Sequence, residues 1–309
     1  MRDTFVKTLV ELAKNDKKIE LVTGDLGFGV LKPFWEQCPN QFTNAGIAEQ
    51  NMASLCAGMA LTGKIVFMYS IGNFPTLRCL EQIRNDCAYH NANVKIVCVG
   101  GGFAYGPLGM SHHATEDLAE MMSLPNVAVF APGDLVEAEE ITKAIVDYPG
   151  TCYLRLGRGG EKRIHDKINN FQIGKAIKIK DGKDIAIFST GAIFDEVLKT
   201  YYELVKNGFE PTIYTFPTIK PIDHCTIVEC AKKHRIIFTV EEHGLLGGFG
   251  SVVSSIVASI RGDKAVVKNV GLDNCFCSIV GSQSYLRKET KIDSESLMKT
   301  IERELKHEK

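Results

Sequence analysis

The sequence lacks the features that would mark a membrane, secreted or nucleic-acid-binding protein. No apolar run approaches the ~20 residues that a membrane-spanning helix needs, and the first residues, Met-Arg-Asp-Thr, contain no apolar signal segment. The sequence also lacks an excess of charge of either sign, because 36 Lys and Arg residues balance 37 Asp and Glu residues. This balance excludes a strongly basic nucleic-acid-binding protein and an acidic disordered tail. We therefore expect a soluble cytoplasmic protein with no membrane and no nucleic-acid partner.

The ten cysteines lack the CxxC spacing that is typical of metal and redox sites. The closest pair, Cys275 and Cys277, would point to opposite faces of a strand, which is poor geometry for a shared metal ion. A disulfide framework is typical of small secreted domains and does not fit a chain of 309 residues. We therefore expect reduced and mostly buried thiols, and no metal site within this chain.

Familiar catalytic fingerprints are missing as well. The chain contains no GxSxG, HExxH or GxxxxGK[ST] motif. The run Gly100-Gly-Gly102 follows a strand-like segment, but its spacing does not match the GxGxxG motif of a dinucleotide fold. The common motifs for hydrolysis, zinc proteolysis and nucleotide binding therefore give no indication of function.

What is present is an alternation of strand-like and helical segments in two blocks. Apolar runs at 64–69 and 94–99 predict buried strands that lie between helical segments. The length of 309 residues is sufficient for about two domains. We expect an α/β fold with two doubly wound domains at 1–160 and 184–309, joined by a polar linker at 161–183.

Two segments carry residue types that suit catalysis. Glu49 begins an otherwise apolar, small-residue helix, where a buried carboxyl group is a candidate acid or hydrogen-bond donor. The alternative is a first-turn glutamate that interacts with the helix dipole. The loop 106–117 presents His112 and His113 after a strand, where ligand sites of open α/β sheets lie. The alternative there is a solvent-exposed loop whose Thr115 caps the next helix.

A family resemblance is carried by several stretches, which occur in this order: Gly46-Ile-Ala-Glu-Gln-Asn-Met52, Glu81-Gln-Ile-Arg84, Ser111-His-His113 with Glu116-Asp-Leu-Ala119, Tyr153-Leu-Arg-Leu-Gly-Arg158, and Glu241-Glu-His-Gly-Leu-Leu-Gly-Gly-Phe-Gly-Ser251. Together they resemble the transketolase family of thiamine diphosphate enzymes over nearly the whole chain. The resemblance covers the pyrimidine-binding and C-terminal domains of that family. The last stretch is also similar to the β subunits of 2-oxo acid dehydrogenases.

The resemblance implies roles around the cofactor for four residues. Glu49 would pair with N1′ of the thiamine aminopyrimidine, in an apolar pocket that keeps the carboxyl group protonated. Phe74 would pack on the aminopyrimidine, and His112 would donate a hydrogen bond to oxyanion charge that develops on the substrate. Asp25 falls in the cofactor and subunit-contact region, where the alternative is a role in stabilising a turn.

The resemblance also implies substrate contacts. Arg158 and Arg2 match family arginines that bind the phosphate end of a sugar, a task that suits the bidentate guanidinium group. The alternative for Arg2 is a mobile terminal charge. His113 is expected to contact the substrate as well.

Three positions depart from the family pattern. Leu108 replaces an acidic residue that reads a donor hydroxyl group, and Gly100 replaces a substrate-binding histidine. Gly72 falls where the family has an aromatic residue against the aminopyrimidine. A wider and less polar pocket of this kind would suit another ketose, a nucleotide sugar or a 2-oxo acid.

The sequence contains no counterpart of the family's GDG…N motif, which holds Mg²⁺ and the cofactor's phosphates. The resemblance therefore implies one half of a split transketolase, which works with a separate N-terminal diphosphate-binding subunit as an α2β2 assembly. That partner would hold most of the thiamine diphosphate and Mg²⁺, and the pair would transfer a two-carbon ketol unit between sugars or sugar phosphates. The alternatives are a 1-deoxyxylulose-5-phosphate synthase-like or 2-oxo acid dehydrogenase β-like subunit, and a non-catalytic assembly partner.

Overall fold

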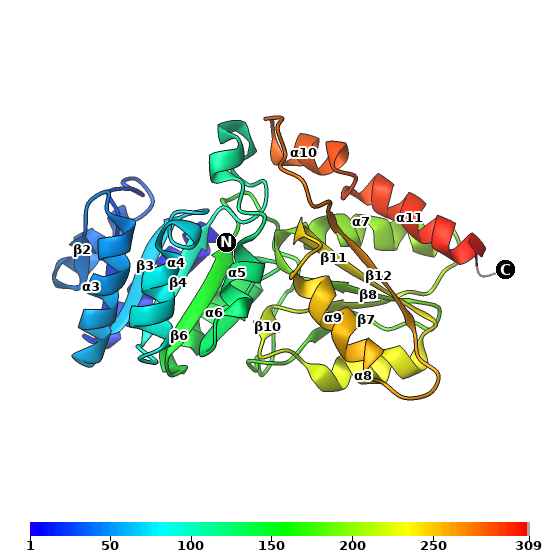
Figure 1. Ribbon diagram of the computed structural model, residues 1–309, viewed down its shortest axis with the longest axis horizontal. Helices are drawn as coiled ribbons and strands as arrows, with labels where there is room; N and C mark the ends of the chain where they lie inside the picture. The colour runs from blue at the N-terminus through cyan, green and yellow to red at the C-terminus, as the bar shows by residue number, and fades with distance from the viewer. Residues whose placement is uncertain (308–309) are drawn as a thin grey trace.

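The computed structural model describes residues 1–307. Its N-terminal half is built on a seven-stranded sheet in the order β10-β5-β6-β4-β3-β1-β2 (Figure 1). All neighbours in this sheet are parallel except β10 (Thr218–Lys220), which runs antiparallel to β5. The strands that this half contributes are β1 (Ile19–Thr23), β2 (Phe42–Asn44), β3 (Ile65–Ile71), β4 (Val94–Val99), β5 (Val127–Phe130) and β6 (Thr151–Leu156). Every residue of β1, β4, β5 and β6 is buried, as expected for parallel strands covered on both faces.

Helices cover both faces of this sheet because successive strand side chains point to opposite sides. In β3 and β4, Phe67 and Val97 join one core cluster, whereas their neighbours Val66 and Ile96 join another. The first cluster includes residues of α1 (Arg2–Asn15), α2 (Lys32–Gln37) and α6 (Leu135–Asp147), and the second includes residues of α3 (Glu49–Leu61) and α5 (Asp117–Ser123). The predicted doubly wound α/β fold is confirmed for this half.

One predicted helix differs from the structure. The sequence pattern predicts continuous helix over roughly 75–90, but the chain forms a 3₁₀ turn at Leu77–Cys79, one α-helical turn at α4 (Leu80–Gln82) and a π-helix at Ile83–Ala88. Short 3₁₀ and π segments often mark functional positions in a helix. Here the 3₁₀ turn carries Arg78, which belongs to the candidate site described below.

The C-terminal half is built on a five-stranded sheet in the order β12-β11-β8-β9-β7, in which only β7 is antiparallel to its neighbour. Its strands are β7 (Ile177–Lys180), β8 (Ala186–Ser189), β9 (Thr212–Thr215), β11 (Ile236–Gly244) and β12 (Val266–Leu272). One face is covered by α7 (Phe194–Lys206) and α11 (Ser294–His307), the other by α8 (His224–Lys233) and α9 (Phe249–Ala258), and α10 (Gln283–Glu289) lies near the first half (Figure 1).

The connection between the halves is more structured than the predicted linker at 161–183. Ile177–Lys180 form β7, an edge strand whose alternating isoleucines and lysines are too short a pattern to recognise in a polar stretch. In addition, β10 (Thr218–Lys220) returns from the second half and pairs with β5 of the first sheet. The second half therefore supplies one strand to the first sheet.

A buried charge network also joins the halves. Arg155 on β6 donates to Asp117 at 2.8 Å and to the backbone oxygen of Glu242 on β11 at 3.0 Å. The Glu242 carboxylate accepts from Arg287 at 2.7 Å and from the backbone N–H of Phe103 at 2.9 Å. Since Phe103 lies in the loop after β4, this network anchors that loop to the second half.

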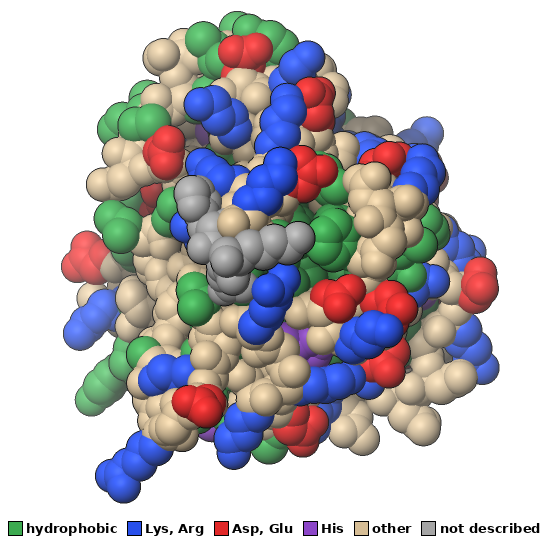
Figure 2. All heavy atoms as spheres, turned by 90° about the vertical axis from the view of Figure 1, so that its right-hand side faces the viewer, with side chains coloured by type: hydrophobic (Ala, Val, Ile, Leu, Met, Phe, Trp, Pro, Cys, Tyr) green, Lys and Arg blue, Asp and Glu red, His purple; other side chains and the backbone are tan. Residues whose placement is uncertain are grey.

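Charges of both signs are interspersed on the side of the molecule that faces the viewer in Figure 2. Ion pairs at the surface include Lys268–Glu304 at 3.1 Å and Lys299–Glu295 at 2.6 Å. None of the helices within residues 1–307 is both long and apolar enough to cross a membrane.

Candidate active site

The candidate site lies at one edge of the first sheet, where the carboxyl ends of its parallel strands meet. Its side chains follow four different strands. Glu49 comes five residues after β2, Arg78 follows β3, His112 lies in the loop after β4, and Arg158 follows β6. The fold thus brings together segments that are far apart in the sequence.

Glu49 is buried at the start of α3 and forms an ion pair with Arg78. The carboxylate side chain is 5% exposed, and the distance from Arg78 Nη1 to Glu49 Oε1 is 2.8 Å. Ala48, the residue before the helix, supplies no capping side chain. The sequence predicts an apolar pocket around Glu49, but the guanidinium group of Arg78 reaches the carboxylate from the loop after β3.

Phe74 connects this ion pair to His112. The Arg78 guanidinium carbon lies 4.2 Å from the centre of the Phe74 ring, and the Phe74 and His112 ring centres are 5.2 Å apart in an edge-to-face arrangement. The Ser111 hydroxyl group lies 3.0 Å from Nδ1 of His112. Burial lowers the pKa of His112, and the nearby His113 and Arg78 lower it further, so the neutral imidazole is favoured at pH 7.

Tyr105 continues the row of contacts toward two arginines. Its ring centre lies 6.3 Å from that of His112, and the Arg158 guanidinium carbon lies 5.2 Å from the Tyr105 ring centre. A Cβ atom added to Gly159 would lie 3.8 Å from Nη2 of Arg2, so the two guanidinium-bearing segments are neighbours. The result is a continuous row of side chains, which we call the contact row, that consists of Glu49, Arg78, Phe74, His112, Tyr105 and Arg158.

Besides Arg2, two predicted site residues lie outside the contact row. His113 is 3% exposed, packs edge-to-face on Phe103 with ring centres 5.1 Å apart, and has Nε2 3.2 Å from the backbone oxygen of Gly106. Asp25 and Asn44 are both exposed, and the two residues exchange hydrogen bonds of 2.9 and 3.0 Å. His113 therefore packs inside its loop, and Asp25 braces the turn after β1 against the segment that leads into α3.

Family models match almost the whole chain. The model for the transketolase pyrimidine-binding domain matches residues 1–160, and the model for the transketolase C-terminal domain matches residues 174–297. The chain belongs to the transketolase family. The second match includes β7, in agreement with the position of that strand in the second sheet.

Individual relatives have the same extent as this chain. A protein of Methanocaldococcus jannaschii named as a transketolase C-terminal section is 37% identical over 312 residues, which cover 100% of this chain and 97% of that protein. An apulose-4-phosphate transketolase subunit of Phocaeicola vulgatus is 36% identical, over 88% of this chain and 86% of its own length. A solved structure described as a split-gene transketolase in an inactive β4 tetramer is 31% identical, with a TM-score of 0.87 over 98% of this chain and 96% of that chain.

The three positions that depart from the transketolase pattern lie around the contact row. A Cβ atom at Gly100 would overlap the Tyr105 ring, so the aromatic side chain occupies the space beside that glycine. Gly72 has a φ of 50°, and a Cβ atom there would lie 3.2 Å from the backbone oxygen of His112. Leu108, in the loop after β4, is 55% exposed.

Arg78 and Tyr105 are site residues that the sequence motifs did not identify. A signal for Arg78 was present, because it lies three residues before the stretch Glu81-Gln-Ile-Arg84 that carries part of the resemblance. No pattern pointed to Tyr105, since its place beside Gly100 depends on how the loop after β4 folds back.

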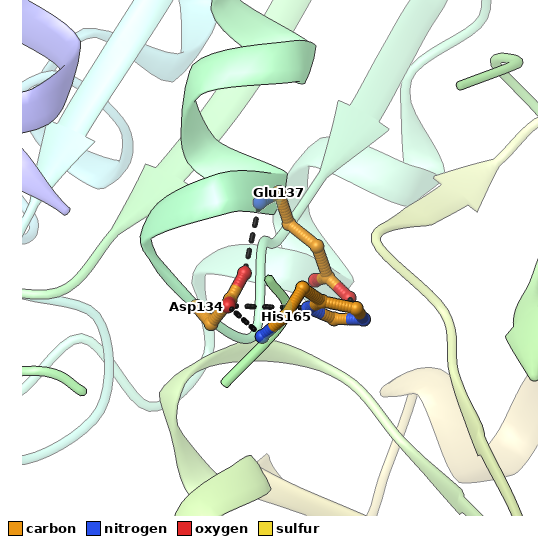
Figure 3. Close-up of side chains that lie close together, drawn as sticks. All are labelled: Asp134, Glu137 and His165. Carbon is orange, nitrogen blue, oxygen red and sulfur yellow. Dashed lines mark hydrogen bonds and ion pairs between the residues drawn. The ribbon is translucent and has the colours of Figure 1, made fainter. Parts of the chain in front are cut away.

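A separate buried group lies at the start of α6. Among residues 1–307, Asp134, Glu137 and His165 form a group of possible metal ligands whose ligand atoms lie within 4.8 Å of one another (Figure 3). His165 lies between the two carboxylates, with Nδ1 3.1 Å from Asp134 and Nε2 3.7 Å from Glu137. Burial raises the pKa of Glu137 to about 7.

Hydrogen-bond donors already occupy both carboxylates of this group. One oxygen of Asp134 accepts from the backbone N–H groups of residues 164 and 165 at 2.8 Å. Glu137 accepts from the Gly133 backbone at 2.5 Å and from the Thr215 hydroxyl group at 2.5 Å. Although burial of the ring opposes it, pairing with Asp134 and Glu137 raises the pKa of His165. We therefore interpret the group as an ionic clasp between α6, the segment after β6 and the end of β9.

Proposed function

We propose that this chain is the C-terminal subunit of a split transketolase, which transfers a two-carbon ketol unit between sugars or sugar phosphates with thiamine diphosphate as cofactor. The observation that carries the proposal is the contact row, in which a buried glutamate, an aromatic ring, a neutral histidine and an exposed arginine follow one another along one sheet edge. Relatives of the same extent are named as transketolase sections or subunits, which supports this assignment.

The residues around Glu49 fit the aminopyrimidine part of the cofactor. A ring with hydrogen-bonding nitrogens requires a buried acceptor or donor beside a flat apolar surface, and Glu49 and Phe74 offer these on either side of Arg78. The Arg78 side chain is 47% exposed, so it can leave the Glu49 carboxylate when a ring takes its place. When bound, thiamine diphosphate supplies the nucleophilic carbon that carries the two-carbon unit.

The chain's own residues then have distinct tasks. Glu49 holds the aminopyrimidine by a hydrogen bond at its buried carboxyl oxygen, and Phe74 packs against the ring. His112 is neutral at pH 7 because its pKa is lowered, so its ring N–H can donate to a carbonyl oxygen that gains negative charge. Arg158 offers an exposed guanidinium group to an anionic end of the substrate, and the nearby Arg2 adds a second positive charge.

His113 and Asp25 act on the site indirectly in this proposal. His113 is buried against Phe103 and stiffens the loop that presents His112, in place of the substrate contact expected from the sequence. Asp25 holds Asn44, whose side-chain oxygen in turn accepts from the backbone N–H of Gly46 at 3.0 Å, just before α3. Both residues therefore fix the two loops that flank the aminopyrimidine site.

The proposal includes a partner and a compartment. A separate N-terminal subunit would hold Mg²⁺ and the diphosphate of the cofactor, and the assembly would be α2β2. The naming of a relative as one subunit of a transketolase and the tetramer of the split-gene transketolase support oligomerisation. All ten cysteines are free thiols, seven of them buried, which suits the reducing cytoplasm.

The alternative chemistry is that of 1-deoxyxylulose-5-phosphate synthase. The synthase of Parabacteroides distasonis is 30% identical over 98% of this chain, but the match covers 48% of that protein. A non-catalytic assembly partner is disfavoured because Glu49 and His112 are both present and joined by the contact row.

Reconstitution with the N-terminal subunit tests the function. The purified pair, supplied with Mg²⁺ and thiamine diphosphate, should convert a ketose phosphate donor and an aldehyde acceptor into the two transferred products, as followed by mass spectrometry. Neither subunit alone should do so. Decarboxylation of pyruvate without ketol transfer would identify the synthase-like reaction instead, and no reaction with either donor class would leave the assembly-partner hypothesis.

A further inference from the structure

The loop after β4 folds back so that an aromatic ring fills the space beside a glycine. Gly100 has a φ of 98°, which favours glycine, and a Cβ atom there would overlap the Tyr105 ring. No side chain can therefore project from position 100 while Tyr105 keeps its place. The Tyr105 ring therefore covers the space beside Gly100, at the end of β4.

Tyr105 stands between the reacting end and the anion-binding end of the contact row. On one side its ring centre is 6.3 Å from His112, and on the other the Arg158 guanidinium carbon is 5.2 Å from the same centre. Within residues 1–307 the exposed Arg158 guanidinium makes this cation–π contact and no ion pair, so the ring orients a positive charge that remains available.

The three positions that depart from the transketolase pattern supply no hydrogen-bonding side chain. Gly72 and Gly100 have no side chain, and the exposed Leu108 has an apolar one. A substrate therefore finds no side chain at these three positions that could read a hydroxyl group. What the surface offers is an aromatic wall and a charge at a set position, which suits a short sugar or aldehyde with an anionic end.

We propose that Tyr105 is a positioning residue that holds Arg158 over its ring and thereby makes the site select substrates with an anionic terminal group over their uncharged counterparts. This inference rests on the proposed function. It assigns recognition of the charge, rather than of the hydroxyl pattern, to a residue of the loop after β4. The tyrosine acts through Arg158 and contributes the wall along which the carbon chain lies.

The first test compares two acceptors in the reconstituted enzyme, D-glyceraldehyde 3-phosphate and uncharged D-glyceraldehyde. Tyr105→Leu should raise KM for the phosphorylated aldehyde about two- to fivefold, the range that one exposed cation–π contact supports. KM for the uncharged aldehyde should change by less than this factor, because that aldehyde has no anionic group for Arg158 to bind. Tyr105→Phe, which keeps the ring, should behave like the wild type. A matched control is Tyr89→Leu, because Tyr89 is 81% exposed near the opposite end of β4.

A double-mutant cycle tests whether the ring acts through the arginine. In an Arg158→Ala background, Tyr105→Leu should have no further effect on KM for the phosphorylated aldehyde. An unchanged KM after Tyr105→Leu alone, an equal change for both aldehydes, or full additivity in the cycle would each overturn the proposal. If Tyr105→Leu lowers the melting temperature, Tyr105→Met fills a similar volume without a ring and takes its place in every comparison.

Binding of inorganic phosphate separates this proposal from the proposed function. Titration of the chain alone, followed by ³¹P NMR, should show that Tyr105→Leu weakens phosphate binding by the same two- to fivefold factor. This measurement needs no activity. A reconstituted wild type without ketol transfer would refute the proposed function, whereas equal phosphate affinity of wild type and Tyr105→Leu would refute the role of Tyr105.

Discussion

The ionic clasp makes stability depend on pH in a direction that the structure determines. Glu137 is completely buried, and burial raises its pKa to about 7, compared with an ordinary value of 4.5. Between these two values the unfolded chain releases a proton that the folded chain keeps. The free energy of unfolding should therefore fall by about 1.4 kcal/mol per pH unit from pH 4.5 to 7, and by about 3 kcal/mol in total, from this one group.

The substitution Glu137→Gln isolates this contribution. The amide can still accept from the Gly133 backbone and can donate to the Thr215 hydroxyl group, which rotates to receive it. It cannot ionise, so the difference in unfolding free energy between wild type and variant should favour the wild type most at pH 5 and shrink toward pH 7.

Urea unfolding at pH 5, 6, 7 and 8 measures this difference directly. Comparison with the variant cancels the effects of other groups, such as His112 and His234, whose lowered pKa values act in the opposite direction. His165 contacts Glu137, and the contribution from its raised pKa is lost only above about pH 6.5, so the change between pH 5 and 6 reports on the carboxyl group. A difference that stays the same from pH 5 to 7 would refute the reasoning.

Three further outcomes follow from the site and its supports. Gly100→Ala should destabilise the chain by at least about 1–3 kcal/mol in urea unfolding, because alanine at this φ is strained and its Cβ overlaps Tyr105. Glu242→Gln should cost about 3 kcal/mol in the same assay, because the buried Arg287 loses its closest carboxylate. In the reconstituted enzyme, transfer should lose rate only below about pH 6.5, where His112 becomes protonated; a loss that begins above pH 7 would contradict this role.

The sequence predicts the alternation of strands and helices well, because each buried strand and each helix has its own local pattern of apolar residues. Val94–Val99 is apolar at nearly every position and is recognisable without its neighbours. β7 and β10 are short, and their identity depends on partner strands elsewhere in the chain, β9 for one and β5 for the other. Local periodicity cannot supply that information, so these strands were missed.

In the candidate site, too, some features could be predicted from the sequence and others depend on the fold. Glu49 and His112 stand in stretches that resemble the family, so their proximity to one sheet edge could be expected from the sequence. The ion pair of Glu49 with Arg78 could not, because it depends on a 3₁₀ turn where a regular helix was predicted. Tyr105 was missed for a similar reason, since the fold of a glycine-rich loop decides where its ring lies.

Exchange of the C2 proton of thiamine diphosphate, followed by proton NMR in D₂O on the reconstituted enzyme, tests the central claim most directly. Glu49→Gln should slow this exchange by about 10²–10⁴-fold, the usual contribution of one positioned acid–base group. Glu20→Gln is a matched control, because Glu20 is also buried and paired with a half-exposed cation, Lys64, at 2.7 Å. We expect rapid exchange in wild type and Glu20→Gln and its loss in Glu49→Gln; exchange at the wild-type rate in Glu49→Gln would contradict the claim.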